Sequence, residues 1–270
     1  MNEVAVPASD AVASVVHLHH EETVMGTVVT LDVYGGSGLT SGSFEPYLKQ
    51  ALASLHESDR IFSLWKSDSL MSRYRRQEIN LETACELVEV LEACEAARNL
   101  CEGWFDPWAL PGGVDPTGYV KGWAAQRALN ELLGAPLHGA IVNAAGDIAS
   151  FGFPAPGAMF EIGIVNPSTP NEMAATATLV GCVATSGVYE RGQHLIDPFS
   201  GARCSRLASA SVMGPDLGLA DALATALAVA GADFLAVIEE LSEFEAFAIS
   251  FEEARHWTSR FPLTSLAASA

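Results

Sequence analysis

The spacing of hydrophobic residues predicts helices in the first half of the chain. Apolar side chains recur every three to four positions in three segments, which is the period of an amphipathic helix. Ser43 is the expected N-cap of the first helix, and Gly103 is expected to stop the second. Residues 104–122 are dense in glycine, proline and aromatic residues, which predicts a structured loop. The predicted helices cover residues 43–63, 80–103 and 123–134.

The second half of the chain predicts mainly strands. Short segments rich in β-branched residues alternate there with turn residues, as they also do at residues 23–36. An apolar helix is expected at residues 219–231, followed by a helix and a strand within 233–250. The order of helices, then strands, then a helix favours an α+β fold over repeated βαβ units. The later predicted strands cover residues 139–152, 159–167, 175–187 and 207–215.

Length and charge narrow the classes of protein and partner. The 270 residues, 49% of them hydrophobic, are enough for one sizeable core. We expect residues 1–20 to be a flexible lead-in and residues 21–270 to form a single domain. The 14 basic and 33 acidic residues give a net charge of −19, which argues against binding nucleic acid or an anionic membrane surface. A few local cations or a metal ion can reverse this field inside a pocket, so a phosphorylated small ligand stays compatible with it.

The cysteines and the N-terminal residues both indicate in which cellular compartment the protein is expected. The five cysteines form no C-x-x-C pair, which argues against a disulfide framework and against a structural zinc site. They are expected to be small buried hydrophobic residues in a reducing compartment. The first residues show no signal peptide, no lipid-attachment cysteine and no apolar run long enough to span a bilayer. We therefore expect a cytoplasmic protein with no integral membrane segment.

An acid in the apolar segment LADALATALAVAG is the first candidate for chemistry. Asp221 and Thr225 are four positions apart, so a helix places both on one face. Their oxygens are hard ligands that suit Mg²⁺, and a buried carboxylate is costly unless it is paired or bound to a metal. The structural alternative is that Asp221 caps the start of the helix while Thr225 bonds the carbonyl four residues back.

Two earlier motifs are also candidates for ligand binding. In DPTGYVKG, Lys121 lies between Asp115 and a helix start, where it could meet a phosphate. The alternative is a solvated surface lysine. In GWFDP, Trp104 and Phe105 could form a stacking wall beside Asp106, or they could be core aromatics next to a turn aspartate.

Residues 184–201, ATSGVYERGQHLIDPFSG, gather hydroxyls, charges and one histidine. His194 is a candidate general base near neutral pH, and a structural histidine is the alternative. His17, His19 and His20 fall in the expected lead-in and are assigned no function. No nucleophile elbow, P-loop, dinucleotide-binding glycine motif or H-E-x-x-H occurs, so the families that depend on these motifs lose their sequence support.

In order along the chain, seven segments resemble the FAD:protein FMN transferase (ApbE) family. The resemblance runs from about Met25 to Gly231 and implies an ApbE-type architecture with a mixed, largely antiparallel sheet, packed helices and a T-fold-like topology. Two departures are Ala145-Gly146, where relatives often have two glycines, and YRRQ at 74–77, where many have Asn. The resembling segments are VMGT, FSLWKSDSLMSR, GWFDP, DPTGYVKGW, IVNAAGDI, VATSGVYERGQHLIDPFSG and ADALATAL.

The resemblance implies roles for individual residues. Met25 and Trp65 would line the flavin site, and Asp115 and Lys121 would hold the adenosine or phosphate portion of FAD. Further FAD contacts would come from Trp104, Phe105, Asp106 and Leu195, and Mg²⁺ would be held by Asp221, Thr225 and the carbonyl of Gly118, with His194 as the base.

The activity implied by the resemblance is a Mg²⁺-dependent transfer. The FMN half of FAD would pass to a Thr or Ser hydroxyl of an acceptor protein, and AMP would leave. Phosphoryl-type transfer depends on positioning and charge neutralisation more than on covalent catalysis, which agrees with a buried acid and a dication. An FAD pyrophosphatase that yields FMN and AMP, and a flavin-binding protein without turnover, are the alternatives. The acceptor itself is not indicated.

Overall fold

The structure is a computed structural model that describes residues 15–187 and 195–267, and a large antiparallel sheet is its centre. Eight strands follow the order β1-β2-β3-β4-β7-β8-β9-β10, and each pairing among the described residues is antiparallel. Strands from both halves of the chain belong to this one sheet, with β1 at one edge and β10 at the other. The strands are β1 (Val16–Val24), β2 (Thr27–Gly35), β3 (Gly139–Ala144), β4 (Asp147–Gly152), β7 (Cys182–Gly187), β8 (Ser209–Gly214), β9 (Glu245–Ile249) and β10 (Arg255–Trp257).

The expected flexible lead-in ends earlier than predicted. Residues 16–20 form the first part of β1, which pairs with β2 along its whole length, whereas residues 1–14 lie outside the described residues. His17 Nε2 and His19 Nδ1 lie 2.7 and 2.9 Å from the same oxygen of Asp32 on β2, and that hydrogen bond raises the pKa of His19. Polar residues alternate along β1 because one face of this edge strand is exposed to solvent. This polar character explains why the sequence predicted a flexible segment there.

The helices differ from the prediction mainly at their ends. The N-cap of α1 is Thr40 instead of Ser43, because the Thr40 hydroxyl accepts the Ser43 amide at 3.1 Å while Ser43 Oγ accepts the Thr40 amide at 2.9 Å. The predicted helix 80–103 becomes helical only from Cys85. The helices are α1 (Ser41–Phe62), α2 (Leu70–Arg75), α3 (Val88–Leu100), α4 (Thr117–Asn130), α5 (Leu217–Ala230) and α6 (Leu235–Glu240), with 3₁₀ turns at 85–87, 107–109 and 232–234.

Helix α4 begins inside the segment predicted as a loop. Its first turns contain Gly118 and Gly122, which lower helix propensity, so the sequence favours a loop there. Tertiary packing overrides this preference, because α4 lies against α5. A Cβ atom at Gly122 would lie 2.3 Å from the Leu217 carbonyl oxygen, so the two backbones approach closely. The close approach fixes how α4 and α5 share the site described below.

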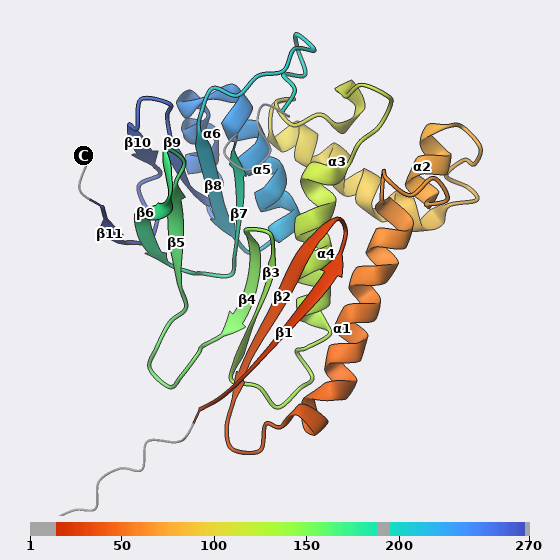
Figure 1. The fold of residues 1–270 in the computed structure, drawn as a ribbon. Helices are drawn as coiled ribbons and strands as arrows, with labels where there is room; N and C mark the ends of the chain where they lie inside the picture. Colours follow the sequence, from red (N-terminus) through yellow and green to blue (C-terminus); the bar gives the residue numbers. More distant parts are fainter. Residues whose placement is uncertain (1–14, 188–194, 268–270) are drawn as a thin grey trace, which may run out of the picture.

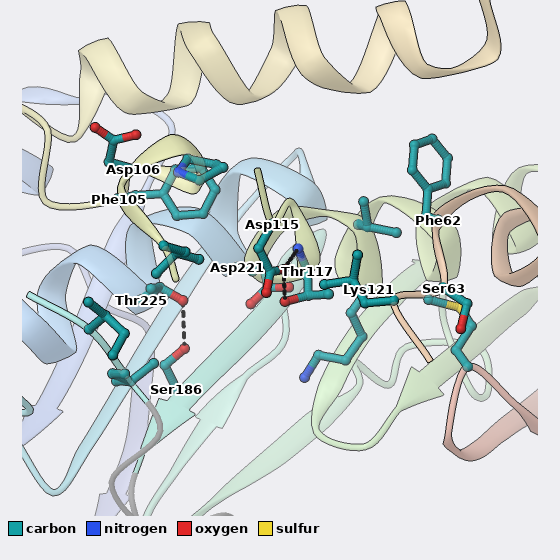
Figure 2. Close-up of a pocket in the computed structure, with 18 of the residues that line it drawn as sticks. Phe62, Ser63, Phe105, Asp106, Asp115, Thr117, Lys121, Ser186, Asp221 and Thr225 are labelled. Atoms are coloured by element: carbon teal, nitrogen blue, oxygen red, sulfur yellow. Dashed lines mark hydrogen bonds between the residues drawn. The ribbon is translucent and has the colours of Figure 1, made fainter. Parts of the chain in front are cut away.

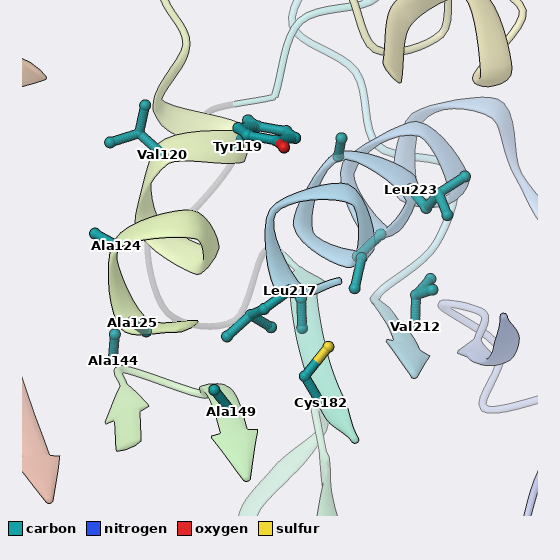
Figure 3. Close-up of a cluster of buried hydrophobic side chains, with 14 of the residues drawn as sticks. Tyr119, Val120, Ala124, Ala125, Ala144, Ala149, Cys182, Val212, Leu217 and Leu223 are labelled. Atoms are coloured by element: carbon teal, nitrogen blue, oxygen red, sulfur yellow. The ribbon is translucent and has the colours of Figure 1, made fainter. Parts of the chain in front are cut away.

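The main core lies between the sheet and helices α1, α4 and α5. Ala124 and Ala125 of α4 and Leu217 of α5 pack on the inner sheet face, together with Ala149 of β4 and Cys182 of β7 (Figure 3). Many of these side chains are small, which allows helices and strands to pack closely. The α5 segment is therefore buried almost throughout, as its apolar sequence predicts.

A small second sheet covers the other face of the main sheet, on the side away from α1 and α4 (Figure 1). The two sheets enclose a second apolar cluster that includes Phe160, Phe247 and Phe261, and the rings of the last two lie 5.6 Å apart. The predicted strand at 159–167 agrees with β5 of the small sheet. The predicted strand at 175–187 covers the end of β6 and all of β7, which belongs to the main sheet, and β11 was not predicted. The strands of the small sheet are β5 (Glu161–Asn166), β6 (Thr169–Thr178) and β11 (Leu263–Leu266), in the order β11-β6-β5.

The α+β class and the largely antiparallel sheet are therefore confirmed. Within residues 15–187 and 195–267, no helix combines the length and apolar character needed to cross a bilayer.

Candidate functional site

One cavity of about 570 Å³ opens between α1, α4, α5 and the loops around residues 63–65 and 104–111. Every site residue predicted from the sequence that the structure describes lines this cavity, although these residues are spread from position 25 to position 225. The predicted base, His194, lies outside the described residues. The predicted residues that line the cavity are Met25, Trp65, Trp104, Phe105, Asp106, Asp115, Gly118, Lys121, Leu195, Asp221 and Thr225.

Asp221 is a buried acid in the interior of helix α5. Its side chain is 3% exposed, and the N-cap of α5 is Asp216, whose carboxylate accepts the Leu219 amide at 2.9 Å. The capping alternative for Asp221 is therefore wrong, because Asp216 already fills that role. Burial, and then the negative charge of Asp147, hold the pKa of Asp221 well above its ordinary value, while Lys121 lowers it.

Thr225 places a hydroxyl one helical turn from Asp221, on the same cavity wall (Figure 2). Its Oγ1 lies 3.1 Å from Ser186 Oγ at the end of β7. Gly118, at the start of α4, faces the same point, since a Cβ built there would lie 3.3 Å from Thr225 Oγ1. A carboxylate, two hydroxyls and a glycine without a side chain therefore meet where α4, α5 and β7 converge.

This arrangement fits a divalent cation. Asp221 Oδ2 is buried and has no hydrogen-bond partner among the described residues, although the Asp147 side chain lies close to the Asp221 carboxyl group. An orphaned buried carboxylate oxygen beside a hydroxyl is a hard oxygen set of the kind that Mg²⁺ accepts, and Mg²⁺ also keeps several waters. No group of three or more His, Cys, Asp or Glu side chains in the described part of the chain could hold a metal ion. A cation here would therefore depend on one carboxylate supplemented by neutral oxygens.

Lys121 is not the solvated surface lysine of the alternative interpretation. Its side chain is 23% exposed, and its Nζ lies 2.9 Å from Oδ2 of Asp147, which is fully buried. The lysine lines the cavity from α4, whereas Asp147 lies beneath it at the first position of β4. In a strongly acidic protein, this ammonium supplies positive charge at a wall that could meet an anionic ligand.

Asp115 and Asp106 also line the cavity, and each of them forms hydrogen bonds that stabilise the backbone next to it. Asp115 Oδ1 accepts the amide and the hydroxyl of Thr117 at 3.0 and 2.6 Å, which stabilises the first turn of α4. Asp106 accepts the Trp108 amide at 2.9 Å and pairs with Arg98 Nε at 2.7 Å. The turn aspartate expected as the alternative for Asp106 is thus present, and the same side chain lines the cavity.

Aromatic side chains form much of the remaining wall. Phe105 is 4% exposed and belongs to the core, whereas Trp65 is 94% exposed on the loop after α1. The Arg206 guanidinium lies 5.0 Å from the centre of the Trp104 ring. The Phe199 ring packs edge to face against the same Trp104 ring, with 4.7 Å between the ring centres. These contacts fix the Trp104 ring in place, while Trp65 remains available to a planar ligand.

Sequence reasoning missed two residues that belong to this site. Ser186 appeared only as one of several polar residues in its segment, and its contact with Thr225 arises because β7 meets α5. Asp147 lies in the segment IVNAAGDI but was not predicted as a site residue. The available signal was an acid directly after the two-residue turn Ala145-Gly146, at a strand position whose side chain faces inward.

Comparisons with known proteins agree on one family. The profile of the ApbE family matches residues 25–112 and 110–248. A comparison with curated protein sequences finds no significant match. Among solved structures, the flavin transferase ApbE from Vibrio cholerae superimposes with a TM-score of 0.77 at 20% identity, covering 92% of this chain and 98% of that one.

Two other structures give the same result. The ApbE protein from Thermotoga maritima has a TM-score of 0.75 at 21% identity, covering 90% of this chain and 97% of its own. The apo form of the Pseudomonas stutzeri flavinyl transferase ApbE has a TM-score of 0.75 at 20% identity, covering 93% and 98%. At these identities the structures establish the shared fold, and the profile match extends over most of the sequence. The chain belongs to the ApbE family.

Proposed function

We propose that this protein is an FAD:protein FMN transferase that depends on Mg²⁺. The observation that carries the proposal is the convergence of the predicted site residues on one cavity, with the orphaned Asp221 oxygen in its wall. A cavity of about 570 Å³ is within the range of small-molecule and cofactor sites. Family membership and the fold shared with flavin transferases support the same activity.

The two ends of FAD would meet different walls. Met25, Trp65 and Trp104 would contact the flavin ring through apolar and aromatic surface, with Phe105 behind them. Lys121 would meet the diphosphate, and Asp115 would accept hydrogen bonds from the adenosine portion. Asp106 and Leu195 would complete the enclosure of the nucleotide.

The cation would be held by Asp221, Thr225 and the backbone carbonyl of Gly118. When bound, Mg²⁺ would neutralise charge on the diphosphate and on the departing AMP. Ser186 accepts or donates a hydrogen bond at Thr225 Oγ1 and would orient that hydroxyl so that a lone pair faces the cation. The protein would then need few positive side chains of its own to bind an anionic nucleotide.

The transfer step joins the acceptor to FMN in one exchange of bonds. The oxygen of an acceptor Thr or Ser hydroxyl attacks the phosphorus of the FMN half, and the diphosphate P–O bond breaks. The electron pair of that bond leaves with AMP, and the hydroxyl proton passes to a base. We propose His194 as this base on sequence grounds, since it lies outside the described residues.

Product analysis tests the proposal directly. The purified protein is incubated with FAD and Mg²⁺, with and without an acceptor that carries a Thr or Ser site, and AMP is measured by chromatography. Covalent flavin on the acceptor is read as fluorescence in a denaturing gel. The transferase yields both AMP and a fluorescent acceptor. Asp221→Asn, which removes the anionic cation ligand with little change in shape, is the matched control and is expected to yield neither.

The same assay separates the alternatives. AMP and free FMN without labelled acceptor would identify an FAD pyrophosphatase, in which water replaces the hydroxyl. FAD binding with no AMP under any condition would identify a flavin-binding protein. Either result, obtained with several candidate acceptors and saturating Mg²⁺, would contradict the transferase proposal.

A further inference from the structure

Asp147 is a charged residue buried beneath the cavity, and neither the binding nor the transfer step described above uses it. It is 0% exposed and does not line the cavity. Its position follows from the turn Ala145-Gly146, whose two residues have φ of 50° and 91° and connect β3 to β4. The alternation along β4 puts Asp147 on the same face as Ala149, which packs toward α4 and α5 (Figure 3).

Within the described part of the chain, a backbone amide and a lysine hold the Asp147 carboxylate, which also lies close to the Asp221 side chain. Oδ1 accepts the backbone amide of Thr185 on β7 at 3.3 Å, and Oδ2 lies 2.9 Å from Lys121 Nζ. A fully buried carboxylate is tolerated when it is paired with a cation and accepts hydrogen bonds. Such a pair is weak evidence for a contribution to stability, because desolvation offsets much of the Coulomb attraction. Its presence next to the candidate cation site therefore calls for another explanation.

One ammonium serves two buried carboxylates here. Lys121 pairs with Asp147, and its charge also reaches Asp221, whose pKa it lowers while Asp147 raises it. Lysine carries a point charge on a flexible four-carbon stem, so its ammonium can move between neighbouring acids. If it moved onto Asp221, it would cover the oxygen that a metal ion needs. Lys121 and Asp221 occupy the same part of the site in Figure 2.

We propose that Asp147 is a positioning residue that holds the Lys121 ammonium away from Asp221 and so leaves the Asp221 carboxylate open to a divalent cation. The inference rests on the proposed function, because it takes the cation to bind at Asp221 and Thr225. Asp147 competes for the lysine from a fixed place, since strand β4 and the Thr185 amide orient it. Removing its charge leaves Asp221 as the remaining acid of this trio for the ammonium.

Direct Mn²⁺ binding tests this role without catalysis. Free Mn²⁺ is measured by electron paramagnetic resonance as the FAD-free protein is titrated. Asp147→Asn keeps the shape but not the charge, and it is expected to weaken Mn²⁺ binding by about 10-fold or more, as second-shell changes at metal sites do. Adding Lys121→Met is expected to reverse the loss, because the competing ammonium is gone. The double variant should then bind Mn²⁺ within about threefold of Lys121→Met alone.

The double-mutant comparison separates positioning from a structural role. A merely structural Asp147 would weaken Mn²⁺ binding equally with or without Lys121, and that result would overturn the inference. Asp197→Asn is the control for loss of a buried acid: Asp197 accepts the Phe199 and Ser200 amides outside the cavity, so this variant can lose stability but should retain parental Mn²⁺ affinity. Weakening in Asp197→Asn equal to that in Asp147→Asn would also count against the inference.

Two outcomes keep the inference distinct from the proposed function. If the parent protein binds no Mn²⁺, the cation site of the proposed function fails. If the parent binds Mn²⁺ and Asp147→Asn binds it equally well, the cation site stands and the positioning role fails. Should Asp147→Asn not fold by circular dichroism, Lys121→Met alone decides: affinity at or above the parental value supports a competing ammonium, and a weaker affinity overturns it.

Discussion

Gly118 of α4 faces the hydroxyl of Thr225 on α5 so closely that no side chain fits between them without a shift. A Cβ atom at Gly118 would lie 3.3 Å from Thr225 Oγ1 and 3.3 Å from Phe105 Cε2, tighter than ordinary van der Waals contact. The wall that would hold the cation thus depends on the lack of a side chain on α4. Gly118, at the start of α4, therefore faces both the aromatic cavity residue Phe105 and the candidate metal ligand Thr225.

Gly118→Ala is therefore expected to impair the site more than the fold. The added methyl group would displace Thr225 or Phe105 by a few tenths of an ångström, and such changes around a metal site reduce affinity or activity by about 10- to 100-fold. The stability change is expected to stay within about 1 kcal/mol, because alanine also has the higher helix propensity. Mn²⁺ titration and thermal unfolding measure the two effects.

Gly122→Ala is the contrasting variant one turn further along α4. Its Cβ would meet the Leu217 carbonyl oxygen at 2.3 Å, and a backbone atom cannot rotate away. Overpacking of this kind costs roughly 1–3 kcal/mol or more, so a clear fall in the free energy of unfolding is expected. Equal stability losses in the Gly118 and Gly122 variants would contradict the distinction drawn between site and scaffold.

Asp221 is expected to destabilise the cation-free protein at neutral pH. Its folded pKa is raised, so the folded state retains a proton that the unfolded state releases above a pKa of about 3.9. Stability then falls as the pH rises from that value through the folded pKa, because the unfolded state binds fewer protons. Asp221→Asn removes this contribution and should unfold at a higher temperature than the parent near neutral pH in a chelator.

The pH and the metal ion supply the controls for this stability effect. The advantage of Asp221→Asn should shrink as the pH falls toward about 4 and disappear below it, where both the folded and the unfolded parent protonate this acid. Mg²⁺ should raise the unfolding temperature of the parent and leave that of the variant unchanged, because only the parent binds it. Differential scanning calorimetry compares the unfolding temperatures of the parent and Asp221→Asn under four conditions: two pH values, each with chelator or with Mg²⁺. Equal stabilisation of both proteins by Mg²⁺ would place the cation elsewhere.

Two hairpin turns offer a matched pair of substitutions. Met25 and Ala145 are the first residues of two-residue turns and have φ of 56° and 50°, a left-handed conformation that costs an L-residue about 1–2 kcal/mol. Ala145→Gly should stabilise the protein by about 1 kcal/mol with unchanged FAD affinity. Met25→Gly should relieve similar strain but weaken FAD binding, because Met25 lines the cavity and Ala145 does not. Fluorescence titration with FAD distinguishes them.

Thiol reactivity tests the buried core. Burial, reinforced by the charges of Asp221 and Asp115, raises the pKa of Cys94 to about 12, so its thiol is protonated at pH 8. Cys101 and Cys182 are also buried with raised pKa values, whereas Cys85 is exposed. Alkylation of the native protein followed by peptide mass spectrometry should label Cys85 and spare the three buried residues until denaturant is added. Rapid native labelling of Cys94 would contradict its burial.

The sequence determined the elements whose signals are local. The period of apolar residues placed α5 within two residues of its observed ends, and glycine after the last turn of α3 marked its stop. The order of the motifs also indicated which residues would line the cavity, through resemblance to a family. These signals depend on neighbouring residues and therefore survive without a tertiary context.

Only the tertiary structure decided the contacts that make the site work. Lys121 meets Asp147, and Thr225 meets Ser186, because the sheet brings β4 and β7 under α4 and α5. The same packing makes a helix of the glycine-containing start of α4, against its local propensity. Burial, and with it the raised pKa of Asp221, is a property of all surrounding chain segments together, so no local pattern of residues can specify it.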